Sequence, residues 1–200
     1  MTRHSLTAIA LAVMLPLAGC GGGDSDDGRP DVAKSSGELL SKTCPAPVDF
    51  ETPAGWKVEH LDLSQETGED LDLMEDLVTT GPFQAVCEVN PKAAGHLGII
   101  RVHVAKTLKG APADILTAYL EADGRNDATP VADGTAGDVP TATTTWRQEV
   151  EAMDEVQPGT AIAVQSKAGG VVITASGFDD DEFTAIRAGL ELARTTLVLR

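Results

Sequence analysis

The chain has 200 residues, of which 31 are Asp or Glu and 15 are Lys or Arg, giving a formal net charge of −16. We expect no nucleic acid partner, because phosphate binding relies on clustered cations that this chain does not show. The same charge disfavours direct adsorption to anionic lipid head groups, so membrane attachment requires an anchor. Hydrophobic residues make up 42% and aromatic residues 4%, which predicts a core of many small aliphatic side chains.

The chain begins with the pattern of a bacterial lipoprotein signal peptide. Arg3 gives a positive start, and an apolar run from residue 6 to residue 17 follows. That run is too short to cross a bilayer, which needs about 20 apolar residues. The next residues, Leu17-Ala18-Gly19-Cys20, resemble a lipobox, in which the cysteine thiol receives a diacylglyceryl group and becomes the new N-terminus.

We therefore predict a lipoprotein signal peptide at residues 1–19 and lipidation at Cys20, with fatty acyl chains such as palmitate. An ordinary secretory signal is the alternative. Two or three acyl chains on one residue are enough for stable anchoring. This lipid anchor is expected to hold the exported protein on the outer face of the cell membrane.

Residues 20–41 are predicted to be a flexible tether that is acidic and rich in glycine. Residues 21–31 contain no apolar side chain, so they cannot bury surface in a core. Asp24, Asp26 and Asp27 suggest a calcium-binding loop, but no glutamate follows at the spacing that such a loop requires. A single domain is expected over residues 42–200, a usual length for one hydrophobic core.

The three cysteines predict one disulfide. Assigning Cys20 to the lipid leaves Cys44 and Cys87 as a pair in an oxidising compartment, where a disulfide is the leading prediction. A zinc site is less favoured, because neither cysteine has a second Cys or His within four residues. A catalytic thiol is also less favoured, because such a cysteine is usually unpaired.

Strands dominate the expected domain, in an order that suggests a meander with added helices. Short strands around Val48 and Val58 flank the turn signal Thr52-Pro53-Ala54-Gly55. Further strands are expected at residues 83–89, 97–105 and 141–149, and residues 161–166 and 171–176 form the clearest hairpin. In the strand at 97–105, apolar residues alternate with Arg101 and His103, which predicts one exposed face.

Two amphipathic helices are expected. Pro112, at a first-turn position, opens a helix over residues 113–122, whose apolar residues form one stripe: Ile115, Leu116, Tyr119 and Leu120. Asp179 begins the second, with apolar residues at steps of three and four: Phe183, Ile186, Leu190 and Ala193. Arg187 and Glu191 lie four residues apart on its opposite face and are expected to pair. A short helix around residues 71–78 is a further candidate. The predicted fold class is α+β, an antiparallel sheet flanked by helices.

One segment carries a family resemblance. Phe50-Glu51-Thr52-Pro53-Ala54-Gly55-Trp56 resembles the strand, Pro-x-Gly-Trp turn and second strand that open PsbP-like domains. A last hairpin followed by a C-terminal helix over residues 179–196 is also similar to that family. The lipobox and the two later cysteines together resemble actinobacterial lipoproteins of the LpqN type. The resemblance covers residues 44–199 and implies an α/β/α sandwich with a binding or scaffolding role. It implies no metal site, because no ligand motif of the photosynthetic relatives matches this chain.

The polar residues predict no catalytic, cofactor-binding or metal-binding site. His60, His96 and His103 lie in no metal-binding spacing, and His103 is expected on the exposed face of its strand. The residues before Ser176 do not form the elbow that a nucleophilic serine requires. The acidic run at residues 179–182 is expected to cap the second helix, with a cation site as the weaker alternative.

The leading functional prediction is a noncatalytic binding or adaptor module of the cell envelope, and not an enzyme. Its expected partner is a cell-envelope protein or a small apolar ligand. Contact loops are expected at residues 62–80 and 123–138, the longest irregular segments. The alternative is a cell-envelope hydrolase, which needs two carboxylates about 5–10 Å apart in a cleft.

Overall fold

The computed structural model describes residues 37–65, 75, 77–150 and 155–200. Cys20, most of the predicted tether and residues 66–74 of the first predicted contact loop lie outside these ranges. Of the predicted helix around residues 71–78, only Glu75, Leu77 and Val78 are described, and these three residues are helical.

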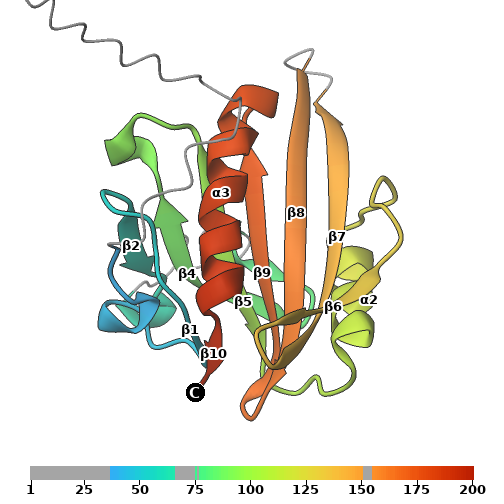
Figure 1. The fold of residues 1–200 in the computed structure, drawn as a ribbon. Coiled ribbons are helices and arrows are strands. Elements are labelled where there is room, and N and C mark those ends of the chain that lie inside the picture. The colour runs from blue at the N-terminus through green and yellow to red at the C-terminus, as the bar shows by residue number, and fades with distance from the viewer. Residues whose placement is uncertain (1–36, 66–74, 76, 151–154) are drawn as a thin grey trace, which may run out of the picture.

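The described residues form an antiparallel sheet with two helices (Figure 1). The strands are β1 (Val48–Asp49), β2 (Lys57–His60), β3 (Thr79–Thr80), β4 (Phe83–Asn90), β5 (Gly98–Ala105), β6 (Ala132–Ala136), β7 (Val139–Val150), β8 (Glu155–Ser166), β9 (Gly169–Gly177) and β10 (Val198–Leu199). The helices are α2 (Pro112–Ala122) and α3 (Asp180–Thr196), with 3-10 helices η1 (Leu40–Lys42), η2 (Leu63–Gln65) and η3 (Lys92–Ala94). Neither α2 nor α3 combines the length and the apolar composition of a membrane-spanning helix.

The main sheet has eight strands in the order β2-β4-β5-β9-β8-β7-β6, with β3 also paired to β4. All its pairings are antiparallel. The predicted hairpin is confirmed as β8 and β9, which turn through Lys167 and Ala168. Gly169 follows the turn with φ at 139°, and a Cβ there would lie 2.3 Å from the carbonyl oxygen of Ala105, so only glycine fits.

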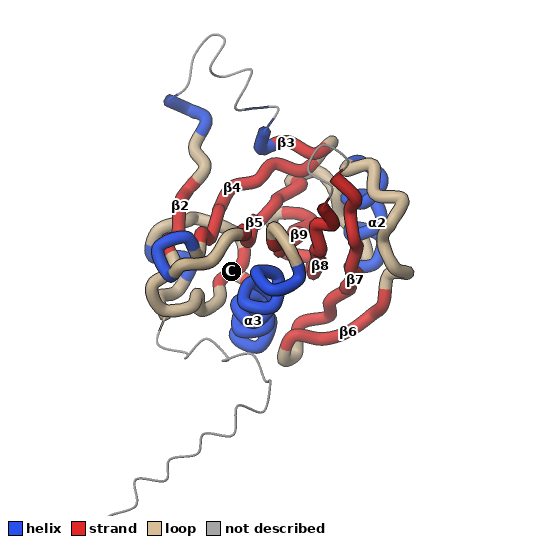
Figure 2. Tube along the Cα trace, turned by 90° about the horizontal axis from the view of Figure 1, so that it is seen from above, coloured by secondary structure: helices blue, strands red, loops and turns tan. Residues whose placement is uncertain are grey.

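The two helices cover opposite faces of the sheet (Figures 1 and 2). Ile162 and Ala163 of β8 are neighbours in the chain, and their side chains enter different cores because strand side chains alternate between faces. Ile162 packs in the core that contains Ile186 and Leu190 of α3. Ala163 packs with Tyr119 and the rest of the predicted apolar stripe of α2. The expected α+β class, an antiparallel sheet flanked by helices, is confirmed.

The expected meander is wrong at two places, and one expected loop contains a strand. The strands near Val48 and Val58 form, but they do not pair with each other: β1 pairs with β10 and β2 pairs with β4. Strand β5 pairs with β9, which lies far along the chain. Within the predicted contact loop at 123–138, residues 132–136 form the edge strand β6 instead of irregular structure.

The predicted exposed face of β5 is also wrong. His103 is only 5% exposed, because α2 covers this face and places the Tyr119 ring centroid 5.0 Å from the histidine ring. Its Nε2 atom lies 3.1 Å from Oγ1 of Thr174, and its buried Nδ1 has no hydrogen-bond partner among the described residues. Burial lowers the pKa of His103 to about 3, with a smaller contribution from Arg101, so the imidazole is neutral in the folded protein.

The predicted disulfide between Cys44 and Cys87 is confirmed, with the two Cα atoms 5.9 Å apart. Cys87 lies in β4, and Cys44 follows η1. Both residues are fully buried. The bond therefore fastens the N-terminal segment of the domain to the middle of the sheet.

Loss of the disulfide is expected to destabilise the domain. For the separation of 43 residues that the bond closes, chain entropy predicts a loss of up to about 4 kcal/mol. Urea unfolding of the oxidised protein and of the Cys44→Ala/Cys87→Ala variant measures this difference. Mass spectrometry after alkylation without reduction checks the bond itself, and two labelled thiols in exported protein would contradict it.

The buried neutral imidazole of His103 predicts a pH-dependent stability. An unfolded histidine takes up a proton below about pH 6.5, whereas the folded one does so only near pH 3. The free energy of unfolding should therefore fall by about 1.4 kcal/mol per pH unit between these values as the pH decreases. Urea unfolding from pH 7 to pH 4.5 measures this slope.

The His103→Gln variant should lose this part of the slope, while His60→Gln, at an exposed position, should keep it. Carboxylates contribute equally to all three proteins, so the comparison isolates the imidazole. Equal slopes for the wild-type protein and His103→Gln would contradict the prediction.

Candidate functional site

A concavity among the described residues lies beside α3, on the face of the sheet that this helix covers. It has a volume of about 710 Å³. We call it the α3 groove and define it by its lining residues, which are Thr145, Trp146, Arg147 and Pro158 of the strands and Asp180, Phe183, Thr184, Arg187, Ala188 and Glu191 of α3. A second hollow of about 300 Å³ shares Thr145, Arg187 and Glu191 with it and extends toward β6.

One flank of α3 forms a wall of this groove. The helix residues that line it recur at steps of three and four, so they share one side of the helix. On another side, Trp56 packs so closely that a Cβ at Gly189 would lie 2.6 Å from the indole. The two flanks therefore differ, because Trp56 covers one of them and the other is open. Phe183, expected in the core stripe, is only half-buried and lines the groove.

An ion pair joins α3 to β7 at one end of the groove. The Arg147 guanidinium donates two hydrogen bonds to the Asp180 carboxylate, at 2.7 Å and 2.9 Å. These bonds hold the pKa of the Asp180 carboxyl below its usual value and raise the pKa of Arg147. Both side chains are exposed, so the pair contributes little to stability and mainly fixes the positions of the two groups.

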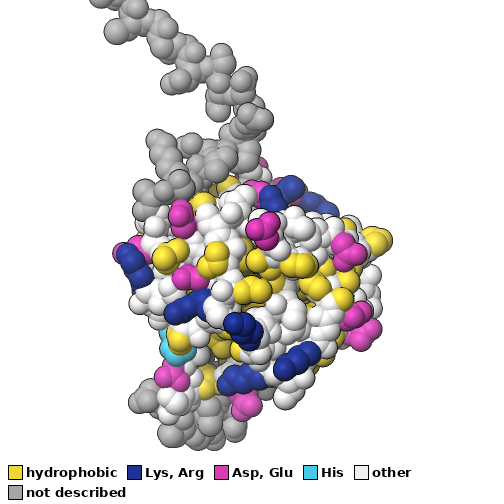
Figure 3. Space-filling view, turned by 60° about the horizontal axis from the view of Figure 1, so that its bottom comes forward, with side chains coloured by type: hydrophobic (Ala, Val, Ile, Leu, Met, Phe, Trp, Pro, Cys, Tyr) yellow, Lys and Arg dark blue, Asp and Glu magenta, His cyan; other side chains and the backbone are white. Residues whose placement is uncertain are grey.

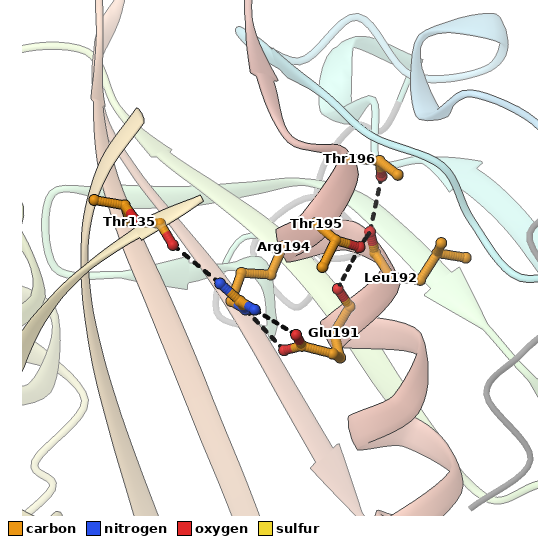
Figure 4. A network of polar contacts seen from close by, with 6 residues as sticks. All are labelled: Thr135, Glu191, Leu192, Arg194, Thr195 and Thr196. Atoms are coloured by element: carbon orange, nitrogen blue, oxygen red, sulfur yellow. Dashed lines mark hydrogen bonds and ion pairs between the residues drawn. The ribbon is translucent and has the colours of Figure 1, made fainter. Parts of the chain in front are cut away.

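A second polar link joins α3 to β6 at the opposite end (Figure 4). Arg194 donates from Nη1 to the carbonyl oxygen of Thr135 at 3.0 Å and from Nε to Glu191 at 2.8 Å. Its Nη2 atom contacts the same carboxylate. The hydrogen bond from Arg194 lowers the pKa of Glu191. The sequence-based pairing of Glu191 with Arg187 is therefore wrong, because Arg194 occupies the carboxylate.

Arg187, the second arginine of the groove, forms no close ion pair with a described residue, and its charge makes only a small contribution to the lowered pKa of Glu191. Its neighbours in the groove wall, Phe183, Thr184 and Ala188, present apolar carbon atoms. The groove therefore offers an apolar surface and the guanidinium of Arg187. This residue lies in α3 between Asp180, which pairs with Arg147, and Glu191, which pairs with Arg194. This combination fits a ligand with an apolar body and an anionic group.

The carboxylates of the groove lack the arrangement of a glycoside hydrolase. Asp180 and Glu191 are separated by eleven residues of α3, which corresponds to about 16 Å along the helix axis. A catalytic pair needs a separation of about 5–10 Å. Each carboxylate also carries an arginine partner and a lowered pKa, whereas a general acid needs a raised one.

Asp179, Glu182 and His96, which were considered from the sequence, have structural partners. Asp179 caps α3, since its carboxylate accepts a hydrogen bond from the Glu182 amide at 2.8 Å, which confirms the predicted capping role. Glu182 accepts from the Leu97 amide at 2.9 Å and lies 3.4 Å from Nδ1 of His96. Across the part of the chain that the structure describes, no three His, Cys, Asp or Glu side chains gather as metal ligands do.

Sequence reasoning assigned no role to the α3 groove. The spacing of its helix residues could have indicated a shared surface, because they form a second stripe beside the core stripe of α3, at positions 180, 183, 184, 187, 188 and 191. The stripe mixes apolar and charged residues, so its hydropathy does not distinguish it from an ordinary solvent-exposed face.

Comparison with known proteins places the chain in a family. A search of curated proteins finds no match. The family model described as "Uncharacterised lipoprotein" matches residues 20–197, beginning at Cys20. That description names neither PsbP-like domains nor the LpqN type. Since the match covers well over half of the 200 residues, the chain belongs to this family of uncharacterised lipoproteins.

Proposed function

We propose that the protein is a lipid-anchored binding module of the cell envelope, and that its α3 groove binds an anionic amphiphile. The single observation behind this proposal is an open, largely apolar groove with one cation, Arg187, that no described residue pairs. The apolar chain of the ligand lies against Phe183 and Ala188, and its carboxylate or phosphate accepts hydrogen bonds from Arg187. The volume of about 710 Å³ is within the usual range for small-molecule sites.

The anchor of this module is the acylated thiol of Cys20. The lipobox motif and the start of the family match at this residue support the assignment. The acyl chains hold the domain on the outer face of the membrane, so its ligands are those of the envelope. The resemblance to PsbP-like domains of the LpqN type also supports a binding role over a catalytic one.

Ligand binding is tested by titrating the full chain with parinaric acid, a fluorescent fatty acid. Ala188→Trp fills the groove, and Arg187→Glu removes the cation and repels the carboxylate. Each should weaken binding at least about tenfold, since a hydrogen bond to a charged group is worth about 1.5–3 kcal/mol. Lys57→Glu makes the same charge change at an exposed position outside the groove and should leave binding unchanged.

Two results would overturn the proposed ligand site. The first is affinity that neither groove variant alters. The second is turnover of glycans or peptides by the purified protein, with loss of that activity in Asp180→Asn or Glu191→Gln, which would establish the hydrolase instead.

Anchoring is tested with Cys20→Ala. This variant has no thiol to acylate, so it should lose labelling by a radioactive fatty acid and leave the membrane fraction for the soluble one when the membranes are washed with 0.5 M NaCl. Cell fractionation with an antibody to the domain measures the shift, and Cys44→Ala/Cys87→Ala serves as the control for cysteine loss. Labelled, membrane-bound Cys20→Ala protein would show that the anchor lies elsewhere.

A further inference from the structure

The charges of the described domain are distributed unevenly along the strands. Carboxylates concentrate at the end where β7 meets β8 and α3 begins, namely Glu149, Glu155 and residues 179–182. The opposite end holds the β8–β9 turn, the start of the β5–α2 connection and Arg200 (Figure 1). Lys106, Lys109, Lys167 and Arg200 lie there. The net charge of −16 therefore conceals a charge separation along the length of the sheet.

Backbone contacts bring these cations together. Ala105, the residue before Lys106, is in register with Gly170, beside the turn that contains Lys167. The Gly170 amide donates to the carbonyl of Leu108 at 2.8 Å, which holds the segment around Lys109 at the same end. Arg200 is fixed by its amide, which donates to the carbonyl of Pro47 at 3.0 Å.

This cationic end also contains an apolar hollow of about 710 Å³. It is lined by Pro45, Ala46, Pro47, His60, Val86, Val104, Lys106, Ala168 and Arg200, and none of these described lining residues carries a carboxylate side chain. Figure 3, which turns this end toward the viewer, shows hydrophobic side chains interspersed with Lys and Arg and also with Asp and Glu. Four carboxylates also lie toward this end: Asp49 is buried and accepts hydrogen bonds from the Ser41 and Phe50 amides, and Asp62, Asp114 and Asp138 lie outside the hollow. The excess of cations is therefore confined to the rim of the hollow, where Lys106 and Arg200 lie.

We propose that this end of the domain docks on the anionic phospholipid surface of the membrane that carries the protein. Lys106, Lys167 and Arg200 contact the phosphate groups, and the apolar hollow accepts part of a lipid. The acidic end is repelled by the same surface and points away from it. The sequence-based expectation that net charge prevents adsorption does not apply to one end of a molecule whose charges are separated.

The tether permits this orientation without imposing it. From Cys20 to Gly37 the extended chain reaches roughly 60 Å. The longest strands, β7 and β8, have 12 residues each and span about 40 Å. Either end of the domain can therefore reach the bilayer, and the charge separation selects the cationic end. Tethering keeps the local lipid concentration high, so a weak contact is sufficient.

The test uses residues 20–200 with Cys20→Ser, so that neither the apolar signal peptide nor an acyl anchor contributes, and vesicles of phosphatidylcholine with or without phosphatidylglycerol. The protein should co-sediment with the anionic vesicles alone, and 0.5 M NaCl should release it. Lys106→Glu/Lys167→Glu should weaken binding about 25-fold or more, since each cation near the surface contributes about fivefold. Lys167→Gln/Arg200→Gln, a milder pair, repeats the test if charge reversal affects folding as seen by circular dichroism.

Lys57→Glu/Lys92→Glu is the matched control, because both lysines are exposed and Lys57 is in register with Asn90 at the other end of β4. This control should bind as the parent does. Equal loss in both double variants, equal binding to both vesicle types or no binding at all would overturn the docking proposal. Ala188→Trp separates it from the α3 groove: vesicle binding should survive this change, and its loss would assign lipid contact to the groove instead.

Discussion

A single helix covers only part of a broad sheet, and this constraint sets the shape of the molecule. An α-helix is about 10 Å wide, whereas neighbouring strands lie about 4.8 Å apart, so one helix covers roughly two strands. The core residues of α3 pack mainly over β9 and reach its two neighbours, β5 and β8, to an equal extent. On the same face, β7 carries short or polar side chains such as Thr143 and Thr145. The hollow beside α3 follows from this mismatch of widths, since the short side chains of Thr143 and Thr145 do not fill it.

Local patterns in the sequence were sufficient to predict both helices and the β8–β9 hairpin, because the residues that define each of these elements are close in the chain. The partners of β1 and β5 were not predictable in this way, since β10 and β9 are distant in sequence. Alternation along β5 identified two faces correctly but could not show that α2 covers one of them. His103 is therefore buried, while Arg101 keeps partial exposure and an ion pair with Glu88 at 3.2 Å.

The arginine partner of Glu191 in the groove could not be predicted from the sequence. Helical spacing allowed Glu191 two arginine partners, Arg187 at i−4 and Arg194 at i+3. Arg194 forms the contact because the carbonyl of Thr135 on β6 also accepts its guanidinium, and this neighbour is known only from the fold. The availability of Arg187 thus depends on an edge strand that the sequence presented as a loop. Likewise, the net charge of the chain does not show at which end of the sheet the cations lie.

The disulfide has a mechanical consequence for a domain held by its N-terminus. Tension applied to residue 37 reaches Cys44 within a few residues, and the covalent bond transfers it to Cys87 in β4. The hydrogen bonds of Glu38 and Leu40 to residues 50 and 52 share this load. The rest of the chain between the two cysteines, which includes β1 and β2, lies outside the load path. Its hydrogen bonds to β10 and β4 are therefore spared shear when the membrane moves. The pulling force enters the sheet at an interior strand, where neighbours on both sides share the load.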